Sequence, residues 1–274
     1  MIKIKMARYL YIFIIAALFA SCSEYQKAIK SEDAKFKYQV AEKMYNKGKY
    51  TKAIRLFEKI APSYNGKKEG EQLFYMYAMS LYKAAEKNTP QYYTASYQFD
   101  KFVAGYPRSE KVEEAAFLST KSTYKLSPRY SLEQVDTYRA IDKLQNFINS
   151  YPNSQYMPEA NEMAKELREK LEKKAYEIAK GYNTIMDYKS AVKALDNFML
   201  EFPGTPYKED ALYYKFDSSY QLAINSVAAR VEERLGNAKA NYAALMKFKP
   251  DTKYKKQADE MLAQINTELE KISK

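Results

Sequence analysis

Two stretches of thirteen residues decide the fold: 140–152 reads AIDKLQNFINSYP and 191–203 reads AVKALDNFMLEFP. Each begins with alanine and ends with proline, and each carries a large apolar residue four and seven positions after the alanine. Spacings of three, four and five residues put these side chains on one face of an α-helix. Proline ends the helix because it lacks the N–H group that the next turn needs. The two stretches therefore predict helices that end at the same point of a repeated unit.

The same spacing recurs elsewhere in the chain. Pro107 follows Ala95, Phe99 and Phe102, Pro250 follows Ala238, Tyr242 and Leu245, and an upstream copy reads Ala53, Phe57 and Ile60, with Asn65 in place of the proline. The small alanine lets a neighbouring helix approach closely, and the larger residues fill the space beyond it. Consecutive prolines lie 45, 51 and 47 residues apart. The sequence thus predicts an array in which each unit buries its apolar face against the next.

The segments between these helices predict the remaining elements. Two residues after each proline comes a hydroxyl residue, which favours an N-cap for the following helix: Ser109, Ser154, Thr205 and Thr252. Relative to a 34-residue repeat, the extra length is expected in long first helices, over 157–186 and 211–235. Residues 255–272 (KKQADEMLAQINTELEKI) then predict a final capping helix.

This pattern resembles the tetratricopeptide repeat, whose second helix carries Ala-x3-Phe and ends at proline. The first copy matches it in register at Ala41, Gly48, Tyr50, Ala53 and Phe57. The period is nearer to that of HEAT or armadillo repeats, but the twelve-residue step from alanine to proline is kept. The resemblance implies an all-α fold, a right-handed superhelical stack of about five helix pairs with a C-terminal capping helix. The expected repeats are 32–65, 68–107, 109–152, 155–203 and 206–250, with the cap at 252–272, in one domain over 32–274.

The N-terminus predicts export. Three basic residues lead into an apolar run over 9–20 (YLYIFIIAALFA), and small residues come just before Cys22, the only cysteine. This order is that of a secretory signal. Twelve apolar residues fall well short of the roughly 20 that span a bilayer, which argues against a short transmembrane anchor.

A lone thiol at the cleavage position suggests a bacterial lipoprotein. Residues 18–22 (LFASC) resemble a lipobox in which leucine comes one place early and phenylalanine takes its position. We therefore expect a signal peptide over 1–21, lipidation of Cys22, and a lipidated linker over 22–31. An ordinary signal with an incidental cysteine is the alternative.

Composition leaves few kinds of catalysis open. The chain has no histidine and its one cysteine is expected to be acylated, so the commonest general base and a thiol nucleophile are missing. Adjacent acids occur at 113–114, 209–210 and 232–233. Neighbours on a helix point to different sides, which favours a solvated face over a catalytic pair. We expect no enzyme activity, no cofactor and no metal site.

Two further groups of residues are candidates for binding. The 28 tyrosines could line a peptide groove, because amphipathic aromatic residues suit interfaces, although many must belong to the core of a chain without tryptophan. Lysines at 247, 249, 253, 255 and 256 would contact lipid headgroups or form a solvated helix face. Removal of residues 1–21, which carry three basic residues and no acid, lowers the net charge from +11 by three. This modest basic excess suits a position beside anionic headgroups or an acidic partner, and export argues against nucleic acid as a partner.

Residues 147–156 (FINSYPNSQY) and 171–179 (LEKKAYEIA) resemble the YfiO or ComL family of outer-membrane assembly lipoproteins. The resemblance covers 22–274 and is distinctive over about 140–205. It implies a non-enzymatic scaffold of the machinery that assembles outer-membrane β-barrels, held on the periplasmic face of the outer membrane by acylated Cys22. The C-terminal repeats would dock the POTRA domains of the barrel-forming assembly protein. The N-terminal repeats would meet unfolded outer-membrane protein substrates.

Other roles remain open for such a lipoprotein. One is a tetratricopeptide lipoprotein that coordinates peptidoglycan synthesis or cell division, although no segment reads as an added wall-binding or coiled-coil domain. Another is a glycan-binding surface lipoprotein of the nutrient-uptake type, but those chains are generally much longer and use tryptophan at the sugar. An enzyme is the least favoured reading.

Overall fold

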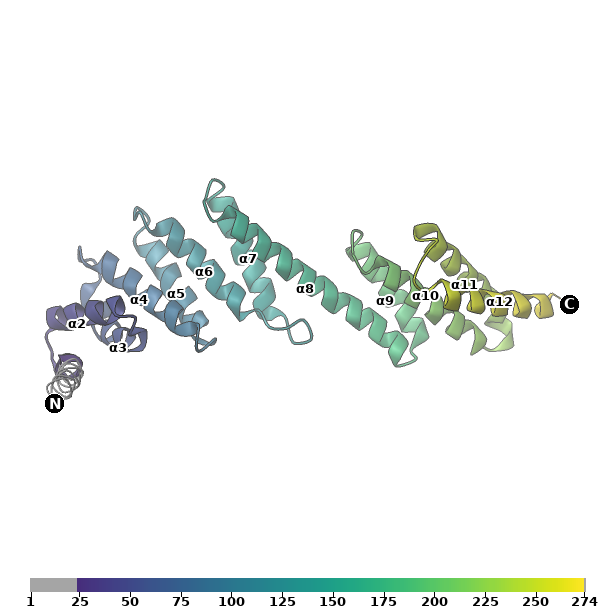
Figure 1. Ribbon diagram of the computed structural model, residues 1–274, viewed down its shortest axis with the longest axis horizontal. Coiled ribbons are helices and arrows are strands. Elements are labelled where there is room, and N and C mark those ends of the chain that lie inside the picture. The colour runs from purple at the N-terminus through teal and green to yellow at the C-terminus, as the bar shows by residue number, and fades with distance from the viewer. Residues whose placement is uncertain (1–23, 274) are drawn as a thin grey trace, which may run out of the picture. The chain divides into compact units, whose positions relative to one another are not determined.

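The computed structural model describes residues 24–273, and the regular structure in that range is helical. In chain order the elements are α2 (Ala34–Asn46), α3 (Tyr50–Ile60), a 3-10 turn (Ala61–Tyr64), α4 (Gly70–Ala85), α5 (Gln91–Gly105), α6 (Val112–Leu126), α7 (Val135–Ser150), α8 (Met157–Thr184), α9 (Tyr188–Glu201), α10 (Lys208–Ile224), α11 (Ala228–Phe248) and α12 (Lys255–Ile272). Helices α2 to α11 form five consecutive antiparallel pairs, followed by α12 (Figure 1). The predicted all-α stack of about five pairs with a capping helix is confirmed. The predicted signal peptide and Cys22 lie outside the described residues.

The chain divides into two compact units. Unit 1 holds α2 to α7 and the first part of α8, up to Leu167, and unit 2 holds the rest of the chain together with the short segment 129–132. In unit 1, α4 packs against α2, α3, α5 and α6, so each first helix contacts its own partner and both helices of the preceding pair. In unit 2, α10 packs against its own partner α11, against the preceding helix α9 and against the final helix α12.

The residues that defined the repeat form the core. The four alanines that precede a proline by twelve residues, Ala95, Ala140, Ala191 and Ala238, are all completely buried. Phe99 and Leu144, four positions further on, are also completely buried. Burying such side chains contributes about 1.5–3 kcal/mol each. The apolar spacing thus marks the helix face on which the pairs stack.

One predicted helix is wrong. The sequence predicted a single helix over 211–235, whereas α10 ends at Ile224 and α11 begins at Ala228. The break occurs where short polar side chains compete for the backbone: Asn225 Nδ2 donates to the carbonyl of Gln221, and Ser226 Oγ donates to the carbonyl of Leu222. The extra length of this repeat therefore lies in its second helix, α11, which has 21 residues.

Two other expectations differ from the structure. Residues 24–30, expected in a linker, are helical, and Tyr25 and Ala28 of this segment are buried in the core of unit 1. Their three-residue spacing puts both on one helix face. The hydroxyl residues after the prolines were expected to be N-caps, but each helix begins two residues later. The N-cap of α10, for example, is Tyr207 and not Thr205.

These hydroxyls instead form a repeated junction between helices. Ser109 Oγ donates to Glu71, Ser154 Oγ to Glu113 and Thr252 Oγ1 to Glu209, each at 2.6 Å. Each acid lies near the start of the preceding first helix, about 40 residues earlier in the chain. The same hydroxyls accept the backbone N–H two residues ahead, at 3.0 to 3.3 Å. One hydroxyl therefore shapes the turn before a first helix and binds that turn to the previous first helix.

A ring contact accompanies this hydrogen bond. Each junction acid is followed, four residues later on the same helix, by an aromatic residue. The ring of this residue contacts the side chain that lies four positions after the proline. The pairs are Phe117 with Tyr156 (centroids 4.3 Å apart) and Tyr213 with Tyr254 (3.8 Å), both stacked within 8° of parallel. After Pro203, Tyr176 and Tyr207 stack in the same way (4.7 Å), and there the Thr205 hydroxyl accepts from the backbone N–H of Tyr207. In the first copy Lys111 takes this place, with Nζ 4.0 Å from the ring centroid of Tyr75. Many of the tyrosines thus serve to join repeats.

Candidate functional site

A hollow in unit 1 is the best candidate for binding near the N-terminus. It has a volume of about 550 Å³ and lies over α2, α4 and the start of α6. We call it the N-terminal hollow. The residues that line it are Glu42, Tyr45, Asn46, Lys68, Glu71, Gln72, Tyr75, Met76 and Lys111. Pockets of about 300–1,000 Å³ are typical of binding sites, so this hollow has room for a short segment of another chain.

The floor of the N-terminal hollow is aromatic and fixed. Tyr75 is buried and meets the rings of Phe99 and Phe102 edge-on, with centroids 6.5 and 5.6 Å away. Burial, followed by the neighbouring carboxylate of Glu114, raises the pKa of Tyr75. Burial likewise raises the pKa of Tyr45. Both phenols therefore stay protonated and neutral at physiological pH.

The walls of the N-terminal hollow are polar and balanced in charge. Two acids and two lysines line it, so the walls carry no net charge. Gln72 Nε2 donates to Glu42 at 2.9 Å, and Glu71 accepts from Ser109 at the junction. Mixed donors and acceptors above an aromatic floor suit a polypeptide segment better than a single charged ligand.

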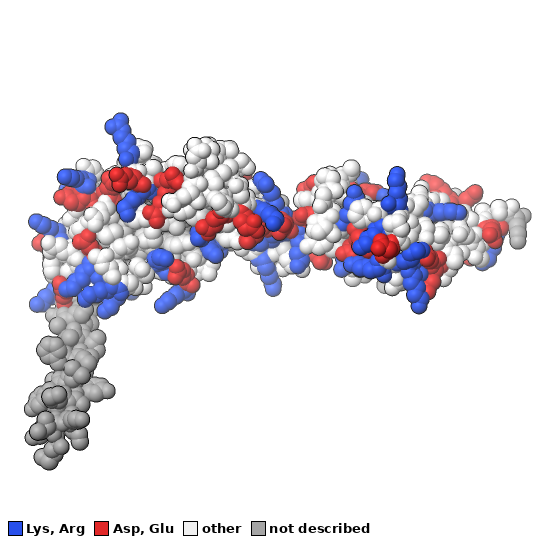
Figure 2. Space-filling model, turned by 45° about the horizontal axis from the view of Figure 1, so that its top comes forward, with Lys and Arg blue, Asp and Glu red and all other residues white. Residues whose placement is uncertain are grey.

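The C-terminal lysines are largely engaged within the protein. Three of the five pair with acids: Lys249 with Glu209 at 2.7 Å, Lys253 with Asp210 at 2.6 Å and Lys255 with Asp259 at 2.6 Å. The hydrogen bond from Lys249, then that from Thr252, lowers the pKa of Glu209 from 4.5 to about 2. The adjacent acids at 209–210 therefore tie α10 to the start of α12. On the face shown in Figure 2, basic and acidic side chains are intermixed on each unit, with uncharged surface between them.

The junction acids were missed by sequence reasoning. Glu113 and Glu209 each belong to a pair of adjacent acids that suggested a solvated face, yet each accepts a hydrogen bond across a junction. The available signal was Glu-x3-aromatic near the start of a first helix, paired with Pro-x-Ser/Thr about 40 residues later. Cys22, the predicted lipidation site, lies outside the described residues.

Residues 24–273 form neither a metal site nor a membrane-spanning helix. Among residues 24–273, no group of three or more potential ligands is placed to hold a metal ion. Within the same range, no helix is long and apolar enough to cross a bilayer.

Stacked helix pairs with hollows along their surface define a helical repeat protein that presents binding surface. Residues 30–235 and 182–272 match the family model YfiO, described as outer membrane lipoprotein, so the chain belongs to this family. The family resemblance read from the sequence is thereby confirmed.

Three relatives carry the name outer membrane protein assembly factor BamD. The protein of Rickettsia prowazekii (strain Madrid E) is 24% identical over 193 residues, which cover 70% of this chain and 75% of the relative. That of Pasteurella multocida (strain Pm70) is 20% identical over 236 residues, or 82% and 88% of the two chains. That of Helicobacter pylori (strain ATCC 700392 / 26695) is 31% identical over 81 residues, or 30% and 37%.

Proposed function

We propose that this chain is a lipid-anchored, non-enzymatic scaffold for the assembly of outer-membrane β-barrel proteins. The observation that carries the proposal is the family match, which extends from residue 30 to 272, together with relatives named as assembly factors. A stack of helix pairs suits this role because it buries a continuous core and leaves a long surface for other chains.

Acylated Cys22 would hold the protein at the periplasmic face of the outer membrane. A single acyl chain gives only marginal, reversible membrane binding, whereas two or more anchoring signals give stable attachment. Replacing Cys22 with serine is expected to release the protein from the membrane fraction. The matched control is Ser23→Ala, which keeps the thiol and should stay membrane-bound. If Cys22→Ser also stayed bound, the anchor would have to lie elsewhere.

The C-terminal repeats would dock the POTRA domains of the barrel-forming assembly protein. The test is crosslinking in living cells, followed by recovery of the tagged full-length chain and identification of its major neighbour. We expect a barrel protein that bears POTRA domains. If none were recovered and the chain sedimented with purified cell-wall sacculi, a role in the cell wall would replace this proposal.

The N-terminal hollow would receive segments of unfolded barrel substrates. Its aromatic floor and balanced polar walls support this part of the proposal. A photo-crosslinking residue at position 72, in the hollow, should capture newly exported barrel proteins. The same residue at position 59, on α3 and outside the hollow, should not. Equal capture at both positions would contradict a substrate site in the hollow.

A further inference from the structure

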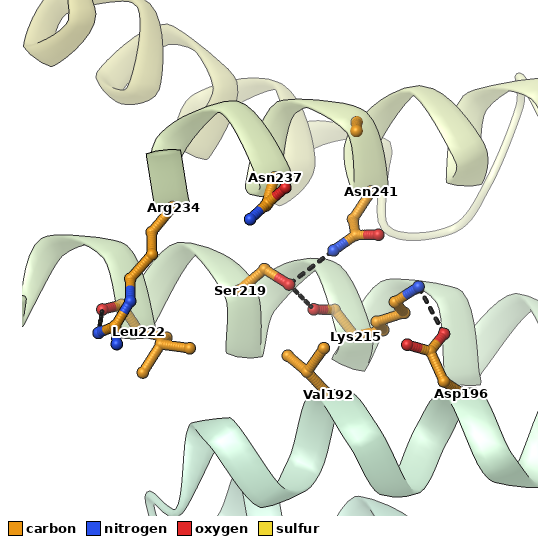
Figure 3. Close-up of a pocket in the computed structure, with 9 residues that line it drawn as sticks. Val192, Asp196, Lys215, Ser219, Leu222, Arg234, Asn237 and Asn241 are labelled. Atoms are coloured by element: carbon orange, nitrogen blue, oxygen red, sulfur yellow. Dashed lines mark hydrogen bonds and ion pairs between the residues drawn. The ribbon is translucent and has the colours of Figure 1, made fainter. Parts of the chain in front are cut away.

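Unit 2 contains a second hollow, built by three consecutive helices. It has a volume of about 290 Å³ and lies between α9, α10 and α11 (Figure 3). We call it the C-terminal hollow. The residues that line it are Val192, Asp196, Lys215, Ser219, Leu222, Arg234, Asn237, Ala240 and Asn241. Helices α9 and α10 contribute the apolar side chains of Val192 and Leu222 beside polar ones, and α11 contributes the polar side chains of Arg234, Asn237 and Asn241.

Two of the polar groups already have partners. Lys215 Nζ lies 2.5 Å from the Asp196 carboxylate, and Asn241 Nδ2 donates to Ser219 Oγ at 2.6 Å. The positive charge of Lys215 is therefore compensated within the hollow. The remaining positive charge among the lining residues is that of Arg234.

The contacts of Arg234 leave its charge uncompensated. Its Nη1 donates to Ser226 Oγ and, at 3.5 Å, to the carbonyl of Leu222. Both acceptors are neutral, and within residues 24–273 the guanidinium takes part in no ion pair with an acid. A guanidinium has five N–H donors in a planar fork that matches a carboxylate. Arg234 can therefore hold its turn and still bind an incoming acid.

The corresponding helix positions in unit 1, on α7, carry side chains with a different charge pattern. At 16, 13 and 9 residues before the proline, α7 carries Asp136, Arg139 and Lys143, whereas α11 carries Arg234, Asn237 and Asn241. Arg139 pairs with Asp136 at 3.1 Å within α7, and Lys143 pairs with Asp100 of α5 at 2.6 Å, so an acid compensates each of these two cations. On α11 the same three positions present one cation and two amides with no acid between them.

The spacing of the two amides matches an extended polypeptide. Asn237 and Asn241 are one turn apart on one face of α11, about 6 Å along its axis. Two residues of an extended chain span about 6.6–6.8 Å. A side-chain amide offers one donor group and one acceptor, as a peptide group does. In Figure 3 Asn237 lies beside Asn241 along the hollow, with Arg234 one turn earlier on α11.

We propose that the C-terminal hollow binds an extended peptide segment of about three residues, with an Asp or Glu side chain of that segment paired to Arg234. The side-chain amide of Asn237 and the side-chain oxygen of Asn241 would bind the backbone of the segment. Val192 and Leu222 would contact the side chain that points towards α9 and α10.

The test uses the purified full-length chain in detergent micelles, so its result is independent of crosslinking in cells. Random heptapeptides displayed on phage are selected on the immobilised chain, and the enriched peptides are synthesised with amidated C-termini. We expect the enriched peptides to share an Asp or Glu residue. Changing that residue to its amide should weaken binding at least tenfold, about 1.4 kcal/mol.

Variants of the protein locate the site. Arg234→Ala should weaken binding of the same peptides at least tenfold. Because Arg234 also holds the turn before α11, Asn237→Ala serves as a second variant and should weaken binding severalfold without lowering the melting temperature. Lys239→Ala removes one positive charge from another face of α11, where Lys239 contacts Asn266, and should bind normally. The proposal fails if no peptide is enriched, if the enriched peptides share no acid, or if both site variants bind normally.

Discussion

Replacing Ser154 with alanine tests whether the junctions hold the repeats together. Ser154 is buried, and its hydroxyl donates to Glu113 at 2.6 Å and accepts from the backbone N–H of Tyr156 at 3.0 Å. A hydrogen bond to a charged group contributes about 1.5–3 kcal/mol, and a cap of a backbone N–H contributes about 1 kcal/mol. Glu113 is half-buried, so water can replace part of the lost contact.

We therefore expect Ser154→Ala to lower the free energy of unfolding of unit 1 by about 2 kcal/mol. For a unit of this size, that corresponds to a fall of about 4–8 °C in melting temperature. Urea unfolding followed by far-UV circular dichroism measures the loss, and an unchanged m-value would show that it is a loss of stability alone.

Two controls make this test specific to the junction. Ser154→Thr keeps the hydroxyl and should cost little, because Thr252 makes the same bond to Glu209 in unit 2. A double-mutant cycle with Glu113→Gln should give a coupling energy of about 1 kcal/mol. The reasoning is refuted if Ser154→Thr costs as much as Ser154→Ala, or if the coupling energy is near zero.

Three further predictions follow from the backbone and from charge. Gly70→Ala should cost about 1–3 kcal/mol, because its Cβ would lie 2.4 Å from a carbonyl oxygen, whereas Gly105→Ala, with no atom within 4 Å, should not destabilise the protein; equal melting temperatures would contradict this. Met186→Gly should raise the melting temperature of unit 2, because Met186 has φ of 64° and a left-handed residue costs about 1–2 kcal/mol; no increase would contradict it. The pKa of Glu209 is lowered from 4.5 to about 2 in the folded state, so its contribution to stability is present above pH 4.5 and is lost as the pH falls towards 2. Urea midpoints measured between pH 7 and pH 2 should fall less for Glu209→Gln than for the unchanged chain, and parallel curves would disprove the assignment.

The sequence was sufficient to predict the helix pairs because their pattern is local. Alanine, two large apolar residues and proline lie within thirteen positions, and a helix of that length displays them on one face. The break between α10 and α11 was missed because no proline or glycine marks it. It depends on Asn225 and Ser226, whose bonds to the backbone of the preceding turn are weak signals in a sequence.

The candidate sites were harder to predict because they depend on long-range contacts. The N-terminal hollow combines residues that lie between 42 and 111 in the chain. Composition alone does not distinguish a tyrosine that lines this hollow, such as Tyr75, from a tyrosine of the core. In the C-terminal hollow, the decisive feature is the compensation of Lys215 by Asp196, which leaves Arg234 as the uncompensated cation. Such pairing requires knowledge of which helices are neighbours.

The junctions also explain how the chain tolerates unequal repeats. Each junction needs only an acid and a ring near the start of one first helix, and a hydroxyl and a ring or lysine just before the next. The length of chain between these two short segments is not specified, which is why the prolines can lie 45, 51 and 47 residues apart. Insertions between the segments would extend individual helices or turns while the connection stays the same. Because the junctions are alike, one repeat can follow another regardless of its length. An array with a different number of repeats could therefore be built by recombination at the prolines.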